Sequence, residues 1–409
     1  MKISKCRNCS KKKLIKVFSF GNLAFTGKFS KFKNIKKAPL RLSICNNCKL
    51  IQLSDSYNIK YLYGLDYGYR TGLNQTMTTH VRNVVKFLKK KTLLKNNDAV
   101  LDIASNDGTL LNFYNKNIIR FGIDPILKKY INLYSKINYK IADFFSKDRI
   151  HNTYSGKFKI ITALSVFYDL EDPNKFLNDI EKLISDDGII LIEFADLYSI
   201  IKYNMFDTIC HEHLAYYTSK IIISMCKNNN LKVIDIKRNS INGGSAQYYI
   251  TKKNSKYSIS KKIRQILVQE KYYKLKNKET FLKFFLKIIE IKKNLSKFIN
   301  NLKKKGEIIH GYGASTKGNV LLQYFKFNNK KINFIAERNP SKYNLYTPGT
   351  NIKIISEKKS RSLRPDYYIV LPWHFKKEIL DRERRTMING SKFIFPLPKI
   401  RIYSRWNLN

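Results

Sequence analysis

Residues 100–111 contain the sequence feature with the clearest chemical meaning. A short apolar run ends in a tight turn that carries Asp102, Asn106, Asp107 and Gly108, and apolar residues able to form a helix follow. A strand that enters a helix through a turn presents backbone N–H groups and the helix N-terminus to a ligand. Turns that bind a pyrophosphate carry more glycines, because the backbone must approach the phosphates closely. One glycine and several polar side chains favour a ligand with hydroxyl, carboxylate and ammonium groups, such as S-adenosylmethionine.

The residues that follow this turn extend the predicted cofactor site. A second predicted strand ends in Asp124, where a carboxylate can accept hydrogen bonds from both ribose hydroxyls. Further along, Asp143 and Phe144 have the residue types that hold an adenine. We therefore predict a methyltransferase, and an ordinary α/β domain with a polar turn is the alternative. The predicted cofactor-binding set is Asp102, Ala104, Asn106, Gly108, Asp124, Asp143, Phe144 and Leu164.

Four of the six cysteines form two CxxC pairs, Cys6 with Cys9 and Cys45 with Cys48. Two such pairs supply four thiolates for a tetrahedral zinc ion and leave no open position for catalysis, so the predicted zinc is structural. Chance pairing of cysteines is the alternative.

The chain has a formal net charge of +48, with 78 Lys and Arg residues against 30 Asp and Glu. Such a charge would favour nucleic acid or an anionic surface as a partner. The excess is mostly Lys and accompanies abundant Asn, Ile, Tyr and Phe, which all have A/T-rich codons, so genome composition is the preferred explanation. We expect no nucleic-acid partner, no membrane insertion, a cytoplasmic location, and a monomer or weak dimer. The basic surface would still attract a phosphate-bearing substrate.

Predicted strands and helices alternate twice along the chain, which is typical of α/β domains with parallel sheets. Between them, apolar residues recur at helical spacing from Phe281 to Leu302 and predict a long amphipathic helix packed between domains. We predict a class I methyltransferase doubly wound sheet, a small N-terminal zinc-binding domain and a C-terminal Rossmann-like α/β domain. The predicted strands are 100–103, 120–123, 160–164, 189–194 and 232–236, then 308–311, 332–336, 366–371 and 392–395. The predicted domains are 1–60 (zinc), 61–250 (methyltransferase), 251–305 (connecting helices) and 306–409 (C-terminal).

Three further segments have residue types suited to chemistry. The sequence HEH at residues 211–213 lacks the spacing of a zinc-protease helix, but a neutral imidazole there could remove a proton beside a ketone. Asn242 and Gly243 lie in a turn whose backbone can approach a ligand. The sequence GYGASTKG at residues 311–318 resembles a phosphate cradle with a lysine, although its spacing is not that of a Walker loop. Packed polar residues of an insertion are the alternative for HEH.

Together these segments resemble the sugar-nucleotide C-methyltransferases, which combine a zinc-binding, a methyltransferase and a Rossmann-like domain. The resemblance spans almost the whole chain and includes the CxxC pairs, the Tyr67–Tyr69 segment, DIASNDG, HEHLAYY, NGGS, GYGASTKG and TPG. It implies a nucleotide-linked 4-keto-6-deoxy sugar as substrate, methylated on carbon through an enolate. It implies His213 as the general base, Glu212 as its neighbouring acid and Tyr69 as the active-site tyrosine. The predicted substrate-binding set is Tyr168, His211, Asn242, Gly243 and Lys317.

The chain departs from this family at three positions. Leu164, Tyr168 and Cys210 stand where members often carry Asn, His and Tyr. The polar contacts to the sugar are therefore rearranged, and methylation of another carbon or of an oxygen stays open. Two functions of a different class also stay open, namely a zinc-containing RNA methyltransferase and a non-catalytic assembly protein.

Overall fold

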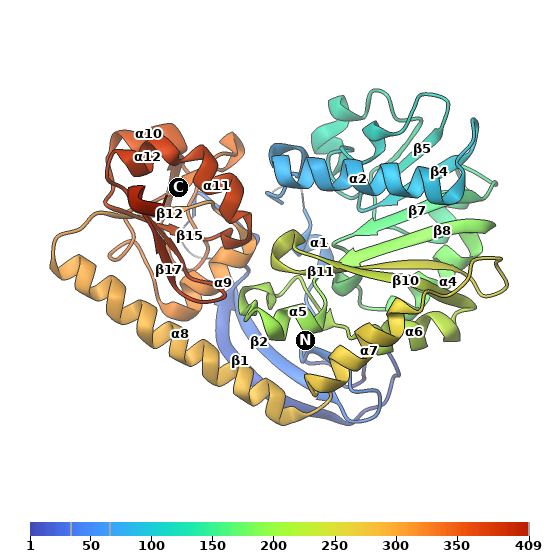
Figure 1. Cartoon of the computed structure of the whole chain (residues 1–409), viewed down its shortest axis with the longest axis horizontal. Helices are drawn as coiled ribbons and strands as arrows, with labels where there is room; N and C mark the ends of the chain where they lie inside the picture. Colours follow the sequence, from blue (N-terminus) through green and yellow to red (C-terminus); the bar gives the residue numbers. More distant parts are fainter. Residues whose placement is uncertain (33–34, 65–66, 408–409) are drawn as a thin grey trace.

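The computed structural model describes residues 1–32, 35–64 and 67–407. Their strands form three sheets, one in each third of the molecule (Figure 1). In chain order the strands are β1 (Leu14–Ala24), β2 (Lys37–Cys45), β3 (Ile51–Leu53), β4 (Ala99–Ile103), β5 (Ile119–Ile123), β6 (Tyr139–Ile141), β7 (Phe158–Leu164), β8 (Ile184–Phe194), β9 (Ala215–Tyr216), β10 (Leu231–Asn239), β11 (Ser245–Lys252), β12 (Ile309–Tyr312), β13 (Phe334–Glu337), β14 (Lys353–Ser356), β15 (Tyr367–Val370), β16 (Lys392–Phe395) and β17 (Arg401–Tyr403).

Twelve α-helices connect these strands within the described residues. They are α1 (Ile59–Leu62), α2 (Gln75–Thr92), α3 (Lys147–His151), α4 (Pro173–Leu183), α5 (Leu197–Lys202), α6 (Ser219–Asn228), α7 (Lys262–Tyr272), α8 (Lys278–Lys304), α9 (Thr316–Phe325), α10 (Glu357–Ser362), α11 (Lys376–Arg382) and α12 (Arg384–Ile388). Four short 3₁₀ helices matter for the site: η4 (Phe167–Asp169), η5 (Phe206–Thr208), η6 (Ile241–Gly243) and η8 (Trp373–Phe375).

The central sheet has the strand order β10-β11-β8-β7-β4-β5-β6. Strands β4 to β8 pair in parallel, whereas β11 is antiparallel to both β8 and β10. The chain order reverses at β4, whose neighbours β5 and β7 lie on opposite sides, and such a switch point is where open α/β sheets bind ligands. This is the class I methyltransferase fold that the sequence predicts. Strand β11, which lies between β8 and β10, is the antiparallel strand of this otherwise parallel sheet.

Alternate residues of the central strands face two separate helix layers. Val100, Ile160 and Ile189 share a core cluster with Val81 and Leu88 of α2, on one face. The next residues along the same strands face the other side, which α4 and α6 cover. Figure 1 shows α2 above this sheet and α4 and α6 below it. The period of two residues along a strand therefore explains both faces.

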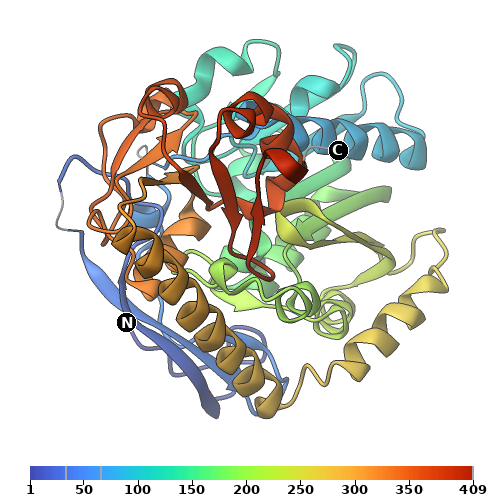
Figure 2. The same cartoon turned by 60° about the vertical axis from the view of Figure 1, so that its left-hand side comes forward.

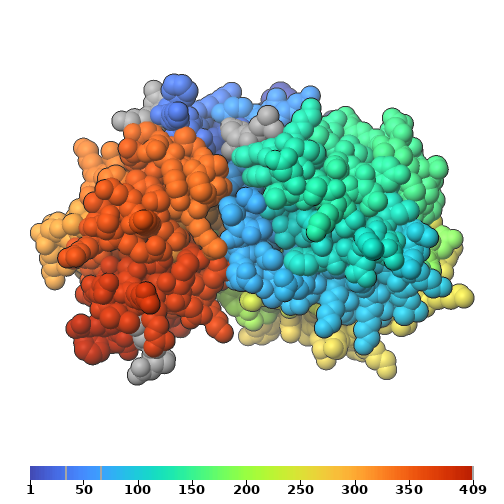
Figure 3. All heavy atoms as spheres, turned by 90° about the horizontal axis from the view of Figure 1, so that it is seen from above, coloured from blue at the N-terminus to red at the C-terminus, as the bar shows by residue number. Residues whose placement is uncertain are grey.

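The C-terminal sheet has the order β14-β13-β12-β15-β16-β17. Its first five strands are parallel and β17 is antiparallel, as in a Rossmann-like domain. The four predicted strands of this part are present, and β14 and β17 are additional. Seen from above, this lobe and the methyltransferase lobe lie side by side and touch along the middle of the molecule (Figure 3).

The predicted long helix is confirmed as α8, which is 27 residues long. It lies against both the N-terminal sheet and the C-terminal domain (Figure 2). The Phe285 ring stacks on Phe18 of β1 at 4.7 Å between ring centres, and Phe298 contacts Tyr367 of β15. The apolar stripe is therefore core, as expected. No helix among the described residues combines the length and the apolar character needed to cross a bilayer.

Candidate active site and zinc site

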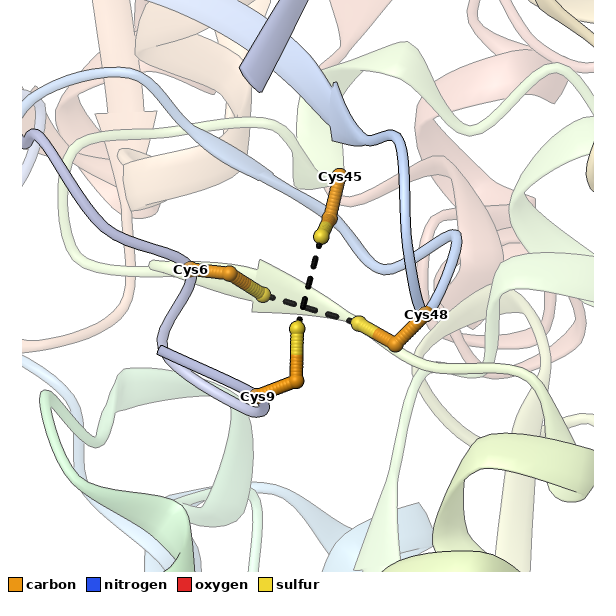
Figure 4. Close-up of side chains that lie close together, drawn as sticks. All are labelled: Cys6, Cys9, Cys45 and Cys48. Carbon is orange, nitrogen blue, oxygen red and sulfur yellow. Dashed lines mark hydrogen bonds between the residues drawn. The ribbon is translucent and has the colours of Figure 1, made fainter. Parts of the chain in front are cut away.

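The four paired cysteines converge on one point in the N-terminal domain (Figure 4). Their sulfur atoms all lie within 4.8 Å of one another, and Cys6 to Cys48 and Cys9 to Cys45 are 3.5 Å apart. Zinc–thiolate bonds of about 2.3 Å in a tetrahedron place sulfurs about 3.8 Å apart. The cluster therefore fits one zinc ion, which the four thiolates would hold in a closed structural site.

The zinc cluster is joined to the methyltransferase domain by Arg7, which lies between two of the ligands. Its guanidinium group donates hydrogen bonds to the Leu53 carbonyl at 2.8 Å and to the Asp55 carbonyl at 3.2 Å. It also forms an ion pair with Glu171, which follows β7, at 3.2 Å. Cys45 ends β2, so the metal site fixes both the strand pair and its contact with the larger domain.

The last strand of the N-terminal sheet comes from the segment that carries HEH. Strand β9 begins two residues after His213 and pairs antiparallel with β3. The Leu53 amide also donates to the Leu214 carbonyl at 2.9 Å. The zinc-binding domain therefore holds the HEH segment directly through the backbone.

The three residues of HEH face different surroundings. The His213 ring is 9% exposed, and the distance from its Nδ1 to the Thr208 carbonyl is 2.6 Å. Because a carbonyl can only accept, Nδ1 carries the ring hydrogen and Nε2 is free to act as a base. Burial, and secondly the charge of Lys317, lower the pKa of His213 to about 3, so the ring is neutral at neutral pH. The Tyr168 ring lies 4.0 Å from it between ring centres.

Glu212 and His211 turn toward the N-terminal domain instead. The Glu212 carboxylate accepts hydrogen bonds from the Thr26 hydroxyl and the Gly27 amide, both at 2.9 Å. His211 is fully buried, with its Nε2 3.1 Å from the Ala38 carbonyl and its ring against Phe25. The structure therefore does not bring these two side chains together with His213.

The predicted cofactor turn lies at the carboxyl end of β4, next to the end of β5. Ala104, Asn106 and Gly108 all have positive φ, so the chain turns back sharply over the sheet edge. The Asp124 carboxylate accepts from the Asn106 amide at 2.9 Å and from the Ile126 amide at 2.8 Å. Asp124 thus closes the turn, and its predicted contact with a ribose stays a prediction. This arrangement fits S-adenosylmethionine, which supplies an electrophilic methyl group when bound.

The other predicted cofactor residues lie along the same edge of the sheet. Asp102 is buried within β4 and accepts a hydrogen bond from Thr162, and burial raises the pKa of Asp102 to about 7. Asp143 and Phe144 follow β6, where Asp143 forms an ion pair with Arg149 at 2.6 Å. Leu164 ends β7, on the other side of the turn. The sheet register therefore gathers the predicted residues from four adjacent strands.

The segment that carries Tyr69 is fastened to the cofactor turn. Asn106 accepts from the Thr71 amide at 2.9 Å and donates to the Tyr69 carbonyl at 3.2 Å. Asp107 accepts from the Gly72 amide and forms an ion pair with Arg70. Tyr69 itself is 38% exposed. Two polar side chains predicted near a ligand therefore also position the candidate active-site tyrosine.

The C-terminal domain places a lysine beside the candidate base. Lys317 donates from Nζ to the Asn242 carbonyl at 3.0 Å, and the Asn242 amide group is 3.5 Å from Ser165, which follows β7. The Trp373 indole donates to Asp207 at 2.8 Å and packs against Gly243, where a Cβ atom would lie 2.8 Å from the ring. Lys317, Asn242 and Gly243 therefore meet at the junction of the two large domains.

The backbone of the glycine-rich turn at residues 311–318 forms hydrogen bonds with other residues of the C-terminal domain. The Ala314 amide donates to Glu337 at 2.6 Å, and the Ala314 carbonyl accepts from Lys342 at 2.7 Å. Of the predicted phosphate cradle, the Lys317 side chain is the part that reaches the candidate site.

Several buried polar residues of this region were not singled out from the sequence. Four buried side-chain atoms of these residues lack a hydrogen-bond partner: Asp169 Oδ1, Asp207 Oδ1, Thr208 Oγ1 and His374 Nδ1. Each lies in a short 3₁₀ helix that follows or connects strands, and no sequence periodicity marks such segments. Their proximity to one another depends on how the domains meet.

Family models match three successive parts of the chain. The zinc binding domain family matches residues 6–63, a methyltransferase domain family matches 73–236, and the C-methyltransferase C-terminal domain family matches 240–398. The C-methyltransferase NovU of Streptomyces niveus is 25% identical over 98% of this chain and 97% of its own length.

Solved structures of other methyltransferases match less than half of the chain. Magnesium protoporphyrin IX methyltransferase from Synechocystis is 14% identical, with a TM-score of 0.34, over 44% of this chain and 88% of its own. The plantazolicin methyltransferase BamL is 15% identical, with a TM-score of 0.36, over 44% of this chain and 87% of its own.

The protein is thus an S-adenosylmethionine-dependent methyltransferase that also carries a zinc-binding domain. Along this one chain, a zinc binding domain family, a methyltransferase domain family and the C-methyltransferase C-terminal domain family match in succession.

We expect Asp124→Ala to weaken S-adenosylmethionine binding about 10–100-fold, because hydrogen bonds to a charged group are worth about 1.5–3 kcal/mol. Burial raises the pKa of Asp124 to about 6. The dissociation constant of the wild-type protein should therefore rise as pH falls through 6, since the protonated carboxyl accepts less well. Calorimetry between pH 5 and 8 checks both effects, and thermal unfolding controls for the fold. Unchanged affinity in Asp124→Ala would move the cofactor site elsewhere.

Proposed function

We propose that this enzyme methylates a carbon atom of a nucleotide-linked 4-keto-6-deoxy sugar. The proposal rests mainly on two side chains that lie in one partly open region. The His213 ring is neutral and its Nε2 is free, and the Lys317 side chain lies beside it. A histidine can remove a proton beside a ketone only while its ring is uncharged. The partly exposed Lys317 side chain from the C-terminal domain suits an anionic substrate.

In the proposed reaction, His213 Nε2 takes the hydrogen on the carbon next to the ketone. The electron pair moves onto the ketone oxygen. The enolate carbon would then form a bond to the sulfonium methyl group as the sulfur–methyl bond breaks, and S-adenosylhomocysteine would leave. The hydrogen bond from Nδ1 to the Thr208 carbonyl fixes the ring orientation and stabilises the charged imidazolium that forms. Tyr168 covers one face of the ring and limits its access to water. Tyr69, fastened to the cofactor turn, would orient the keto sugar.

The direct test is incubation of the purified protein with S-adenosylmethionine and a panel of nucleotide-linked keto sugars, followed by mass spectrometry. We expect one class of sugar nucleotide to gain a single methyl group. If no member of the panel gains mass while the protein binds S-adenosylmethionine, the substrate belongs to another class. An O-methylated product would support the sugar O-methyltransferase alternative.

Lys317 should contribute to binding of the sugar nucleotide rather than of the methyl donor. Its amine donates to Asn242 in the described structure and has further hydrogens for a ligand. We therefore expect Lys317→Ala to raise the KM of the sugar nucleotide more than that of S-adenosylmethionine. Steady-state kinetics with each substrate varied in turn measures both values. If neither KM changes, the C-terminal domain has another task.

One feature favours the alternative of a zinc-containing RNA methyltransferase. A hollow of about 650 Å³ on α8 is lined by Lys292, Lys293, Lys297 and Lys304, and by Tyr324 at the far end of α9 from Lys317. Lysines around an aromatic ring can hold nucleic acid. That function predicts binding whose affinity falls steeply with salt and transfer of the methyl group to RNA. We propose the small-molecule reaction because this hollow lies away from His213, and we propose that it takes place in the cytoplasm.

A further inference from the structure

A buried carboxyl group, that of Asp169, lies in the chain segment that contacts the HEH segment and has one oxygen without a hydrogen-bond partner. Asp169 ends η4 and is 6% exposed, and its Oδ1 atom is buried without a hydrogen-bond partner. A buried polar atom without a partner has lost its hydration and gained no hydrogen bond in exchange. A ligand oxygen would satisfy this atom.

The backbone places Asp169 against the HEH segment. The Leu214 amide donates to the Tyr168 carbonyl at 2.7 Å, so the chain just before Asp169 lies beside the chain just after His213. The Tyr168 side chain covers the His213 ring. The Asp169 carboxyl interacts with the Tyr63 hydroxyl, and the Tyr63 and Tyr67 side chains are both partly exposed. Asp169 therefore lies beside the HEH segment and in contact with Tyr63, one of two partly exposed tyrosines.

Asp169 and Glu212 form a buried acid pair whose members have different hydrogen-bond partners. Glu212 already accepts two hydrogen bonds from Thr26 and Gly27, which stabilise a carboxylate. Asp169 has no comparable donors, and burial raises its pKa well above the usual range, with a smaller contribution from the charge of Glu212. The hydroxyl of Tyr63 opposes this shift without cancelling it.

The titratable groups that interact electrostatically with Asp169 are tyrosines, a thiol and a second acid. They are Tyr63, Tyr67, Tyr168, Cys210, Glu212, Tyr216 and Tyr217. A cation would favour the carboxylate, whereas tyrosines, a thiol and a second acid do not. The side chain can therefore offer an O–H group to a ligand at neutral pH.

We propose that Asp169 donates a hydrogen bond to the ketone oxygen of the sugar, at the point where negative charge develops. This inference rests on the proposed function. When His213 takes the proton from the adjacent carbon, the electron pair moves to the ketone oxygen, and the O–H of Asp169 shortens its hydrogen bond to that oxygen while keeping its proton. A neutral carboxylic acid stabilises an oxyanion in this way without first placing a negative charge beside it. Asp169 would then be a catalytic residue alongside His213.

The test compares Asp169→Ala, which removes the donor, with Asp169→Asn, which keeps an N–H donor of the same shape. We expect Asp169→Ala to lower kcat about 10²–10³-fold, as for the loss of one oxyanion donor, and Asp169→Asn to restore most of it. Exchange of the sugar hydrogen in deuterated water, followed by NMR with S-adenosylhomocysteine present, should change in parallel. Asp172→Asn, on the exposed cap of α4, is the matched control and should behave like the wild type.

The pH profile gives a readout that a structural role would not change. The wild-type rate should fall as pH rises through the elevated pKa of Asp169, because the carboxylate cannot donate, and Asp169→Asn should lack this fall. If Asp169→Asn is as inactive as Asp169→Ala while both variants still bind S-adenosylmethionine, the proposal is contradicted. Asp169→Ala with the wild-type exchange rate would contradict it as well. A wild-type enzyme that exchanges and methylates no keto sugar would instead overturn the proposed function itself.

Discussion

Replacing His213 by Asn should lower the rate of methyl transfer about 10²–10⁴-fold, the usual contribution of a positioned general base. The hydrogen on a carbon next to a ketone is too weakly acidic for water to remove at neutral pH. The His213 ring has the required state, because its Nδ1–H is held by the Thr208 carbonyl and its Nε2 is unprotonated. An Asn side chain can occupy the space but cannot accept the proton. Exchange of the sugar hydrogen in deuterated water, measured by NMR with S-adenosylhomocysteine, should be lost with the activity.

The matched control is His211→Asn, two residues away. His211 is also buried but contacts Ala38 and Phe25 of the N-terminal domain. This variant should lose stability and keep the exchange rate per folded molecule. Both variants should still bind S-adenosylmethionine. If His213→Asn exchanges the hydrogen at the wild-type rate, another residue is the base, and Tyr168 is the first to test.

Loss of the zinc ion should unfold the N-terminal domain and abolish activity with it. Binding of a structural zinc ion contributes on the order of 10 kcal/mol in small zinc modules. Here Cys9→Ser or Cys48→Ser would remove one of the four ligands. Strand β3, which begins shortly after Cys48, pairs with β9, so the damage should reach the HEH segment. We therefore expect both variants to lose about one zinc per chain and to lose methyl transfer.

Metal analysis, circular dichroism and an activity assay on the same preparations check this prediction. Cys226→Ser serves as the control, because Cys226 is fully buried in α6 and belongs to no metal cluster among the described residues. It should retain the zinc ion. A metal-free preparation that is folded and fully active would show that the cysteine cluster has no structural role.

The parts of the fold that follow from local pattern could be predicted from the sequence. Strand β4, its turn and Asp124 combine a buried apolar run with turn residues, and both signals are local. The CxxC pairs likewise indicate a metal site through spacing alone. The long helix α8 is marked by its helical period. The predicted domain boundaries and site roles stay predictions.

The features that the sequence did not reveal depend on contacts between distant segments. Strand β9 has two residues and pairs with β3, more than 160 positions earlier, so no periodicity marks it. The contacts of Glu212 are long-range too. The resemblance places Glu212 beside the base, whereas its carboxylate faces Thr26 and Gly27. Strand β11 was not predicted. It follows β10 after a short turn, and it lies between β10 and β8 in the sheet. The buried, unpaired Asp169 becomes visible only when its neighbours are known.

We propose that His213 makes a carbon atom of a nucleotide-linked keto sugar nucleophilic toward S-adenosylmethionine. Carbon NMR of the product formed with S-adenosylmethionine carrying a ¹³C-labelled methyl group tests it most directly. The label should appear as a methyl group bound to the carbon beside the ketone, in the wild-type enzyme and not in His213→Asn. A label found on an oxygen atom or on RNA, or an equal yield from His213→Asn, would contradict the claim.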